Sequence, residues 1–377
     1  MHSPATFLFA IILALSIAPA PQAQEKSPPR EKKGCGTVIP PEQIDAELAS
    51  MAESALKNSA PSAITPPPAD PYYLPMTIHI VHKSDGTGGF SLKQLNEAML
   101  DLNRLWRQVG VQFFIHGNID HILSDTHHYI PNDPAKRDAL RTVNVVPNTI
   151  NVYFTYLEGF CGEATLTGNN VQGVLIDNAC TGSLWDPSTF AHEIGHYFNL
   201  YHTHEPRFGL ECPSGINGST AGDLMDDTAA DPDQSIWRGL YPKPCGYYEP
   251  VPTPAGCDTT PYNPPTGNLM SYAENLCRLE FTPKQISRIL ETLRNADNRK
   301  NLINSGTRYV DQMANASNIK CTYGAPCRTM EKAVQAANNG DLIVIKHGAY
   351  WAPSFGNKRL TLNKWGLEPN TGALLVP

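Results

Sequence analysis

The chain has 377 residues, nine cysteines and a formal net charge of −7 at pH 7, with a sequence pI near 5.9. This acidic balance excludes the basic surface typical of proteins that bind nucleic acid or anionic lipid. The length leaves room for one large domain and smaller pieces.

The first predicted segment is a secretory signal peptide over residues 1–23. An apolar run from Phe7 to Ile17 is followed by small residues, with cleavage favoured at Ala23. The run is too short to cross a bilayer as a stable helix, although a short membrane anchor is the alternative. No later stretch is apolar enough to span a membrane. We therefore expect a secreted, extracellular protein, or a periplasmic one if the source is bacterial, whose cysteines mostly pair.

Residues 24–70 are expected to precede the folded domain as an appendage. Polar residues lead into a short amphipathic helix over 41–57, which has proline in its first turn. The following stretch, PSAITPPPADPYYLP, is too rich in proline for anything but an extended linker.

The pattern over residues 71–305 predicts one α+β domain. Alternating or continuous apolar residues predict strands at 76–83, 111–116, 149–156 and 171–178. Ser91 is expected to cap a helix that reaches about Val109, and a second helix is expected to start near Asp186-Pro187. Thr282 and Gln285 form a capping box for a closing helix.

The segment HEIGHYFNLYH has the spacing of a metal site. His192 and His196 are four residues apart, so on a helix both project from one face, with Glu193 beside them. A left-handed turn at Asn199 would bring His202 to the same cation. Three imidazoles and one open position are typical of a catalytic zinc site.

The alternative is that surface histidines fell at this spacing by chance, which the third histidine and the turn residue disfavour. His204 and His82 lack such spacing, and we expect both at the surface.

These residues match HExxHxx(G/N)xxH, the zinc signature of the metzincin metalloendopeptidases, and the chain resembles the pappalysin (cytophagalysin-like) group. NLMSY supplies Met270 as the methionine turn beneath the metal. The resemblance implies a twisted, mostly parallel sheet with two long helices, an active-site helix and an irregular lower half that ends in a helix.

The implied activity is zinc-dependent hydrolysis of peptide bonds in proteins. Glu193 would act as general base and then acid, and Tyr272 would donate a hydrogen bond to the oxyanion, its alternative role being a packed loop tyrosine. A protein or peptide substrate would bind extended along an edge strand near CGEATLTG. The sequence indicates neither the cleavage preference nor the oligomeric state.

The loop GDLMDDTAADPDQ concentrates carboxylates, which suit calcium. The resemblance points to the GDxxxDT pattern, although Ala229 replaces the usual proline. The candidate ligands are Asp223, Asp226, Asp227 and Thr228, and the alternative is a solvated acidic loop.

Eight cysteines are expected to form disulfides. Cys161 with Cys180 and Cys321 with Cys327 are predicted pairs. The other four allow three pairings, of which the resemblance suggests Cys212–Cys257 and Cys245–Cys277.

Residues 306–377 resemble the opening of a pectate-lyase-like parallel β-helix. They form either a truncated repeat domain or a small β-rich module that packs on its neighbour. An alternative function follows: a surface- or glycan-binding protein that uses this module, with a non-essential protease-like domain.

The ninth cysteine, Cys35, stands in a Cys-Gly-Thr context that resembles the latency motif of pappalysin-like precursors. A thiolate could fill the open zinc position of the precursor, and the flanking glycines would let the backbone enter a narrow cleft. The alternative is an unpaired thiol or a disulfide to another chain.

Overall fold

The computed structural model describes residues 34–56, 63–183, 186–232, 245, 255–346, 348–365 and 374–376. The predicted signal peptide, the start of the predicted appendage and part of its linker lie outside the described residues. None of the helices in the described ranges is long and apolar enough to cross a membrane.

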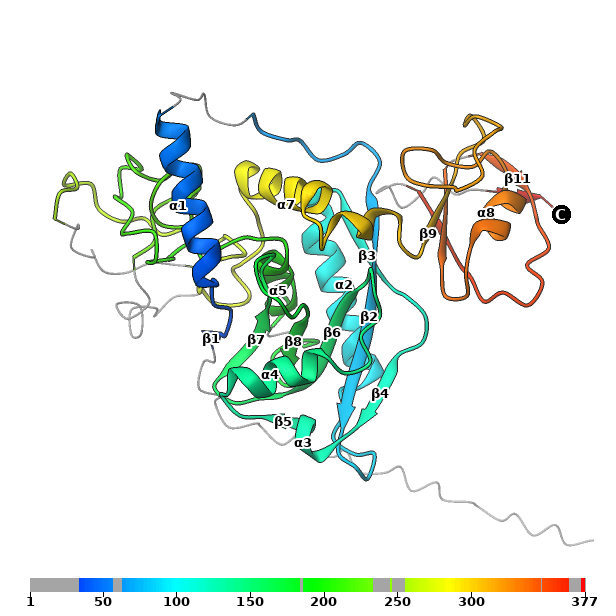
Figure 1. The fold of residues 1–377 in the computed structure, drawn as a ribbon, viewed down its shortest axis with the longest axis horizontal. Helices are drawn as coiled ribbons and strands as arrows, with labels where there is room; N and C mark the ends of the chain where they lie inside the picture. The colour runs from blue at the N-terminus through cyan, green and yellow to red at the C-terminus, as the bar shows by residue number, and fades with distance from the viewer. Residues whose placement is uncertain are drawn as a thin grey trace, which may run out of the picture. The chain divides into compact units, whose positions relative to one another are not determined.

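A mostly parallel sheet lies at the centre of the fold (Figure 1). Its strands are β1 (Gly34–Cys35), β2 (Tyr72–His82), β3 (Val111–Ile115), β4 (Asp120–Leu123), β5 (Tyr129–Ile130), β6 (Ile150–Leu157), β7 (Phe160–Ala164) and β8 (Val174–Asp177). The strand order is β1-β7-β8-β6-β2-β3, with β4 beside β2 and β5 beside β6. β7 runs antiparallel to β8, whereas β1 runs parallel to β7. β2, β6 and β8 are buried almost throughout, as parallel strands covered on both faces are.

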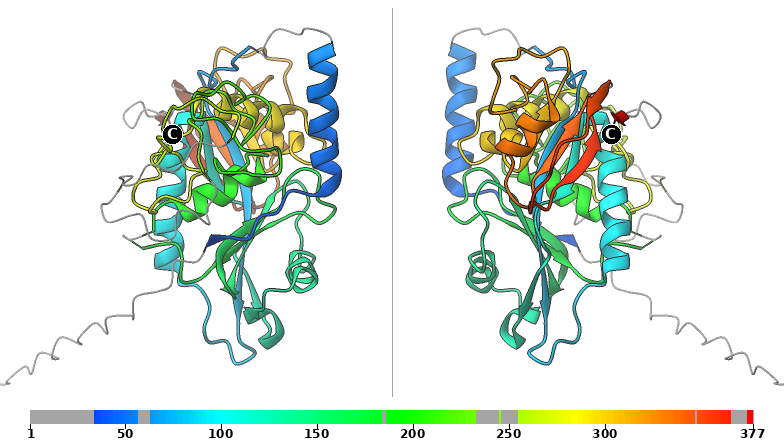
Figure 2. Two further views of the ribbon diagram at one scale, coloured as in Figure 1. Left: turned by 90° about the vertical axis from the view of Figure 1, so that its left-hand side faces the viewer. Right: turned by 90° about the vertical axis from the view of Figure 1, so that its right-hand side faces the viewer.

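Helices cover both faces of this sheet (Figure 2). The helices are α1 (Pro41–Leu56), α2 (Leu92–Trp106), η1 (Arg107–Val109), α3 (Asp125–His128), α4 (Pro134–Arg141), α5 (Thr189–Tyr197), α7 (Pro283–Asn295) and η2 (Lys300–Asn304). α2 and α5 pack on one face in the main apolar core, and α4 packs on the other. The predicted α+β class with a mostly parallel sheet is confirmed.

The helix starts agree with the sequence at two positions and differ at a third. Ser91 caps α2, and Thr282 and Gln285 form the expected capping box of α7. The active-site helix α5 begins only at Thr189, so the start predicted near Asp186-Pro187 is wrong by two or three residues. The carboxylate of Asp186 still accepts hydrogen bonds from the backbone N–H and hydroxyl of Thr189 at 3.1 and 2.9 Å.

The C-terminal module contains β9 (Thr307–Val310), α8 (Met330–Ala336), β10 (Leu342–Ile345), β11 (Ala349–Trp351), β12 (Thr361–Lys364) and β13 (Leu374–Val376). β12, β10 and β9 form one parallel ladder, and β11 and β13 form another. Tyr309 and Trp365 pack with Tyr73 of β2, whose hydroxyl donates to the Lys364 carbonyl at 2.7 Å. The module thus packs against the start of β2. Its resemblance to a pectate-lyase-like β-helix stays a prediction.

Trp106 joins α2 to the active-site helix. Its side chain is fully buried among Phe113, Phe198 and Phe281, and its indole N–H donates to the Ala191 carbonyl at 3.3 Å.

We expect Trp106→Ala to lower the free energy of unfolding by about 3–5 kcal/mol, because it leaves a large cavity in the core. Denaturant-induced unfolding measures the change. Leu100→Ala on the same helix is the matched control, since Leu100 is 72% exposed and should lose less than about 0.5 kcal/mol. A loss below about 1 kcal/mol for Trp106→Ala would contradict this packing.

Candidate active site

The active-site helix α5 is buried along its whole length. His192, Glu193 and His196 lie on it, while Ile194 packs in the main core. Gly195 allows Met270 to lie directly beneath the helix, because a Cβ at Gly195 would be 2.5 Å from the Met270 sulfur. The methionine turn therefore forms a packed floor under the histidines.

A left-handed turn at Asn199 ends this segment. The residue has φ of 72°, a conformation that asparagine tolerates better than most residues. Its side-chain oxygen accepts hydrogen bonds from the hydroxyl of Thr167 at 3.0 Å and from the amide of Gln43 at 2.8 Å. The reversal places His202 against the two helical histidines, as the sequence predicts.

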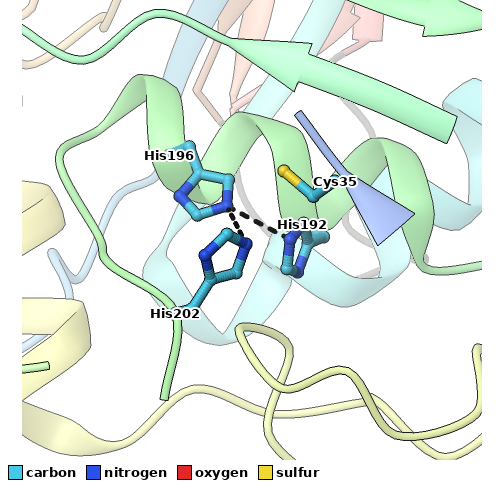
Figure 3. Close-up of side chains that lie close together, drawn as sticks. All are labelled: Cys35, His192, His196 and His202. Carbon is cyan, nitrogen blue, oxygen red and sulfur yellow. Dashed lines mark hydrogen bonds between the residues drawn. The ribbon is translucent and has the colours of Figure 1, made fainter. Parts of the chain in front are cut away.

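The three imidazoles converge through their Nε2 atoms (Figure 3). The Nε2 atom of His196 lies 3.1 Å from that of His192 and 3.0 Å from that of His202. The Nδ1 atoms of His192 and His196 donate to the carbonyls of Leu269 at 2.6 Å and Leu200 at 2.8 Å.

These hydrogen bonds fix the tautomers of His192 and His196, so their Nε2 atoms both present lone pairs. Two acceptors 3.1 Å apart repel each other unless a cation lies between them. Nitrogen ligands of a tetrahedral zinc ion are spaced about 3.3 Å apart. The donor set therefore fits zinc.

Burial keeps these imidazoles neutral, the form that binds a metal. It lowers the pKa of His192 and of His202 well below the usual value, and that of His196 to about 4. Burial, together with the negative charge of Glu163, also raises the pKa of Glu193 to about 8.

Cys35 completes a group of four potential ligands. Its sulfur and the three histidine nitrogens all lie within 4.8 Å of one another (Figure 3). It forms no disulfide. Burial raises the pKa of the Cys35 thiol well above its usual value, and the charge of Glu193 adds to this effect. A divalent cation among these groups would favour the thiolate instead.

The backbone around Cys35 occupies the cleft beside α5. β1 forms the edge of the sheet and pairs with β7, and the Gly36 N–H donates to the Gly162 carbonyl at 2.8 Å. The Tyr272 hydroxyl accepts from the Cys35 N–H at 2.8 Å and donates to the Cys35 carbonyl at 3.0 Å. Thr37 lies 3.4 Å from the Glu193 carboxylate through its hydroxyl. Tyr272 and Glu193 therefore both face a chain bound at this edge.

The expectation that His204 lies at the surface is wrong. His204 is only 8% exposed and stacks on His202, with a ring-centroid distance of 4.9 Å. Burial lowers its pKa to about 3. His82 is partly exposed and hydrogen-bonds His121 at 2.9 Å. Its position is therefore closer to the expected surface location. Spacing alone gives no signal for His204, because its burial depends on contact with the distant loop that contains Tyr272.

The acidic loop divides into a buried and an exposed set. Asp223 is 1% exposed and Glu211, which the sequence analysis missed, is 3% exposed. Both Glu211 oxygens and the Oδ2 atom of Asp223 lack hydrogen-bond partners among the described residues. Asp226 pairs with Lys284, while Asp227 accepts from the Thr282 hydroxyl and the Lys284 N–H, each at 2.8 Å.

The disulfides in the structure are the four pairs expected from the sequence and the resemblance: Cys161–Cys180, Cys212–Cys257, Cys245–Cys277 and Cys321–Cys327.

Comparison with known proteins gives metalloproteases among the similar sequences. An extracellular metalloprotease of Pyricularia oryzae is 27% identical over 309 residues, which are 75% of this chain and 94% of the relative. Mouse pappalysin-1 is 31% identical over 127 residues, which are 32% of this chain and 7% of that protein. No protein-family model matches the chain. Tannerella forsythia promirolysin has 16% identity and a TM-score of 0.49, covering 72% of this chain and 97% of its own.

The chain is a metalloprotease that is similar to fungal extracellular metalloproteases and, over a shorter stretch, to pappalysin-1. The enzyme class and the resemblance indicated by the histidine motif and methionine turn are thus confirmed. Zinc is the metal that this class implies, and the His-rich group fits it. The alternative of a surface- or glycan-binding protein is not favoured.

Proposed function

We propose that this metalloprotease is a secreted endopeptidase made as a latent precursor, in which His192, His196 and His202 hold zinc and Cys35 is the fourth ligand. The observation that carries the proposal is the convergence of unprotonated imidazole nitrogens and one thiol at a single point. Zinc bound by the three histidines would lower the pKa of water and polarise the scissile carbonyl.

Glu193 is the proposed general base. Its carboxylate lies 3.4 Å from the Cys35 sulfur, at the edge of the donor cluster. Gly162 of β7 leaves room for it, since a Cβ there would lie 2.7 Å from the Glu193 carboxyl carbon. In this role Glu193 takes a proton from the attacking water and passes it to the leaving amine.

Tyr272 and the strand β7 are proposed to bind the reacting chain. The two hydrogen bonds between the Tyr272 hydroxyl and the Cys35 backbone support this role, because they join the phenol to a peptide group in the cleft. The same hydroxyl would donate to the oxyanion that forms on a substrate carbonyl. An extended substrate would add to β7, where β1 lies in the precursor.

Residues 24–70 are proposed as the propeptide, ahead of a peptidase domain at 71–305 and the module at 306–377. Beyond Cys35, the helix α1 supports this assignment by its contacts with the zinc-binding turn. The Gln43 amide donates to the Asn199 side chain and to the Tyr201 hydroxyl, each at 2.8 Å. Ile39 packs with Tyr201 and Phe208 in an apolar cluster.

Calcium is proposed as a second cofactor, bound near Glu211, Asp223 and Thr228. The unpartnered, buried oxygens of Glu211 and Asp223 support this, because buried carboxylates need a counter-charge. Burial, followed by the negative charge of Asp223, raises the pKa of Glu211 to about 9.

Glu193→Gln should lower kcat/KM on a quenched fluorescent peptide by about 10²- to 10⁴-fold, because it removes the base. Zinc content, measured by elemental mass spectrometry, should stay near one per chain, since the three histidines are unchanged. Removal of zinc with a chelator should abolish wild-type activity, and added zinc should restore it. Full activity in Glu193→Gln would refute the mechanism but not the enzyme class.

Cys35→Ala should make the uncleaved precursor at least about tenfold more active than the uncleaved wild type, because the fourth zinc position opens. Gel electrophoresis verifies that the chain is intact during the assay. Val38→Ala is the matched control: Val38 is 55% exposed beside the latch and should leave latency unchanged. Equal inactivity of Cys35→Ala and wild type would exclude the latch.

Calcium at about 100 times its dissociation constant should stabilise the wild type by about 2.7 kcal/mol against the calcium-chelated protein. Thermal unfolding in calcium and in a calcium-selective chelator measures the shift. Asp223→Asn should abolish it, whereas Asp226→Asn, which alters an exposed lysine pair, should retain it. The reverse result would assign calcium to the exposed set, and no shift in the wild type would exclude calcium.

A further inference from the structure

A buried arginine lies beside the active site without a role in the steps above. Arg278 is 5% exposed. Its Nε atom donates to the Ser188 hydroxyl at 3.1 Å, and one terminal nitrogen donates to the Ser271 carbonyl at 3.2 Å. The other terminal nitrogen donates to the Asn275 side chain at 2.5 Å and to the Thr189 hydroxyl at 3.4 Å.

All of these hydrogen-bond partners are neutral. Burial lowers the pKa of the Arg278 guanidinium, and the nearby charges of Asp186 and then Glu193 oppose this effect. Within the described residues, no carboxylate forms an ion pair with Arg278. Burying a charge without an ionic partner is costly. We therefore infer the role of Arg278 from the hydrogen bonds that its guanidinium makes.

These hydrogen bonds join two segments that carry active-site groups. Ser188 and Thr189 lie at the start of α5, ahead of the first zinc-binding histidine. Ser271 and Asn275 lie on either side of Tyr272 in the loop that follows the methionine turn. The Ser188 hydroxyl also donates to the Asn275 carbonyl at 2.7 Å.

The guanidinium is planar and rigid, and its donors point in fixed directions. It therefore fixes where the loop from 271 to 275 lies against the helix. Tyr272 stands within that loop, with its ring centroid 4.8 Å from that of His202.

We propose that Arg278 is the positioning residue for Tyr272, holding its hydroxyl at the place where the oxyanion forms. The inference rests on the proposed role of Tyr272 and adds a residue to it. Arg278 itself touches neither substrate nor metal in this role and acts through the loop.

A double-mutant cycle tests the proposal. Arg278→Met, Tyr272→Phe and the double variant are produced as full chains and activated by the treatment that activates the wild type. Arg278→Met should lower kcat by roughly 30- to 100-fold, since misplacing a group by about 1 Å can cost 10²-fold, while KM changes less than threefold. In the Tyr272→Phe background, the same change should cost less than threefold.

Arg278→Lys separates charge from geometry, because it keeps the positive charge but loses the planar fork. We expect it to recover only a small part of the lost kcat. Hydrogen exchange of each zinc-loaded precursor gives a readout that does not depend on activity. In Arg278→Met, exchange should accelerate in peptides that cover 270–278 and stay unchanged in peptides that cover 192–198.

Equal losses from Arg278→Met in the wild-type and Tyr272→Phe backgrounds would overturn the proposal, since the arginine would then act independently of the tyrosine. Unchanged exchange over 270–278 would overturn it as well. If Tyr272→Phe alone retains wild-type kcat, the proposed role of Tyr272 fails, and the positioning role fails with it. A loss of zinc in Arg278→Met would show a general structural role instead.

Discussion

The structure depends on one electrostatic constraint: acceptor nitrogens of buried imidazoles face one another at about hydrogen-bond distance. His192 and His196 each donate Nδ1–H to a backbone carbonyl, so neither can donate through Nε2 to the other. Their burial prevents water from relieving the repulsion. A cation resolves the conflict, and much of the surrounding architecture orients these two carbonyls and the reversal at Asn199.

The groups proposed for catalysis are also those that contact the N-terminal segment. Tyr272 binds the Cys35 backbone, Glu193 lies against the Cys35 sulfur and the Thr37 hydroxyl, and β7 pairs with β1. The same cleft would thus hold the N-terminal segment in the precursor and the substrate in the active enzyme. The segment blocks the metal, the base and the substrate edge together, and the contacts of α1 extend the blockage to the turn at Asn199.

Local sequence signals predicted the elements around the site well. Helical spacing placed two histidines on one face, and the turn preference of Asn199 accounts for the third. Ser91 and Thr282 marked helix starts because capping is a local interaction between residues a few positions apart. The strand β2 begins earlier than predicted, at Tyr72, because its start pairs with β3 far along the chain.

Features that depend on distant contacts had no such signal. His204 is buried by the loop around Tyr272, which the sequence places about 70 residues later. Arg278 follows a disulfide cysteine and looks like an ordinary surface residue until the fold brings Ser188 to it. In the acidic loop, Glu211 lies outside the aspartate-rich motif, and only packing distinguishes its buried oxygens from those of the exposed Asp226.

Zinc K-edge X-ray absorption on the intact precursor tests the central claim most directly, because it counts the ligand atoms around the metal. We expect three nitrogen ligands at about 2.0–2.1 Å and one sulfur at about 2.3 Å. In Cys35→Ala we expect a lighter atom to replace the sulfur. A wild-type precursor with only nitrogen and oxygen around zinc would contradict the proposed ligation by Cys35.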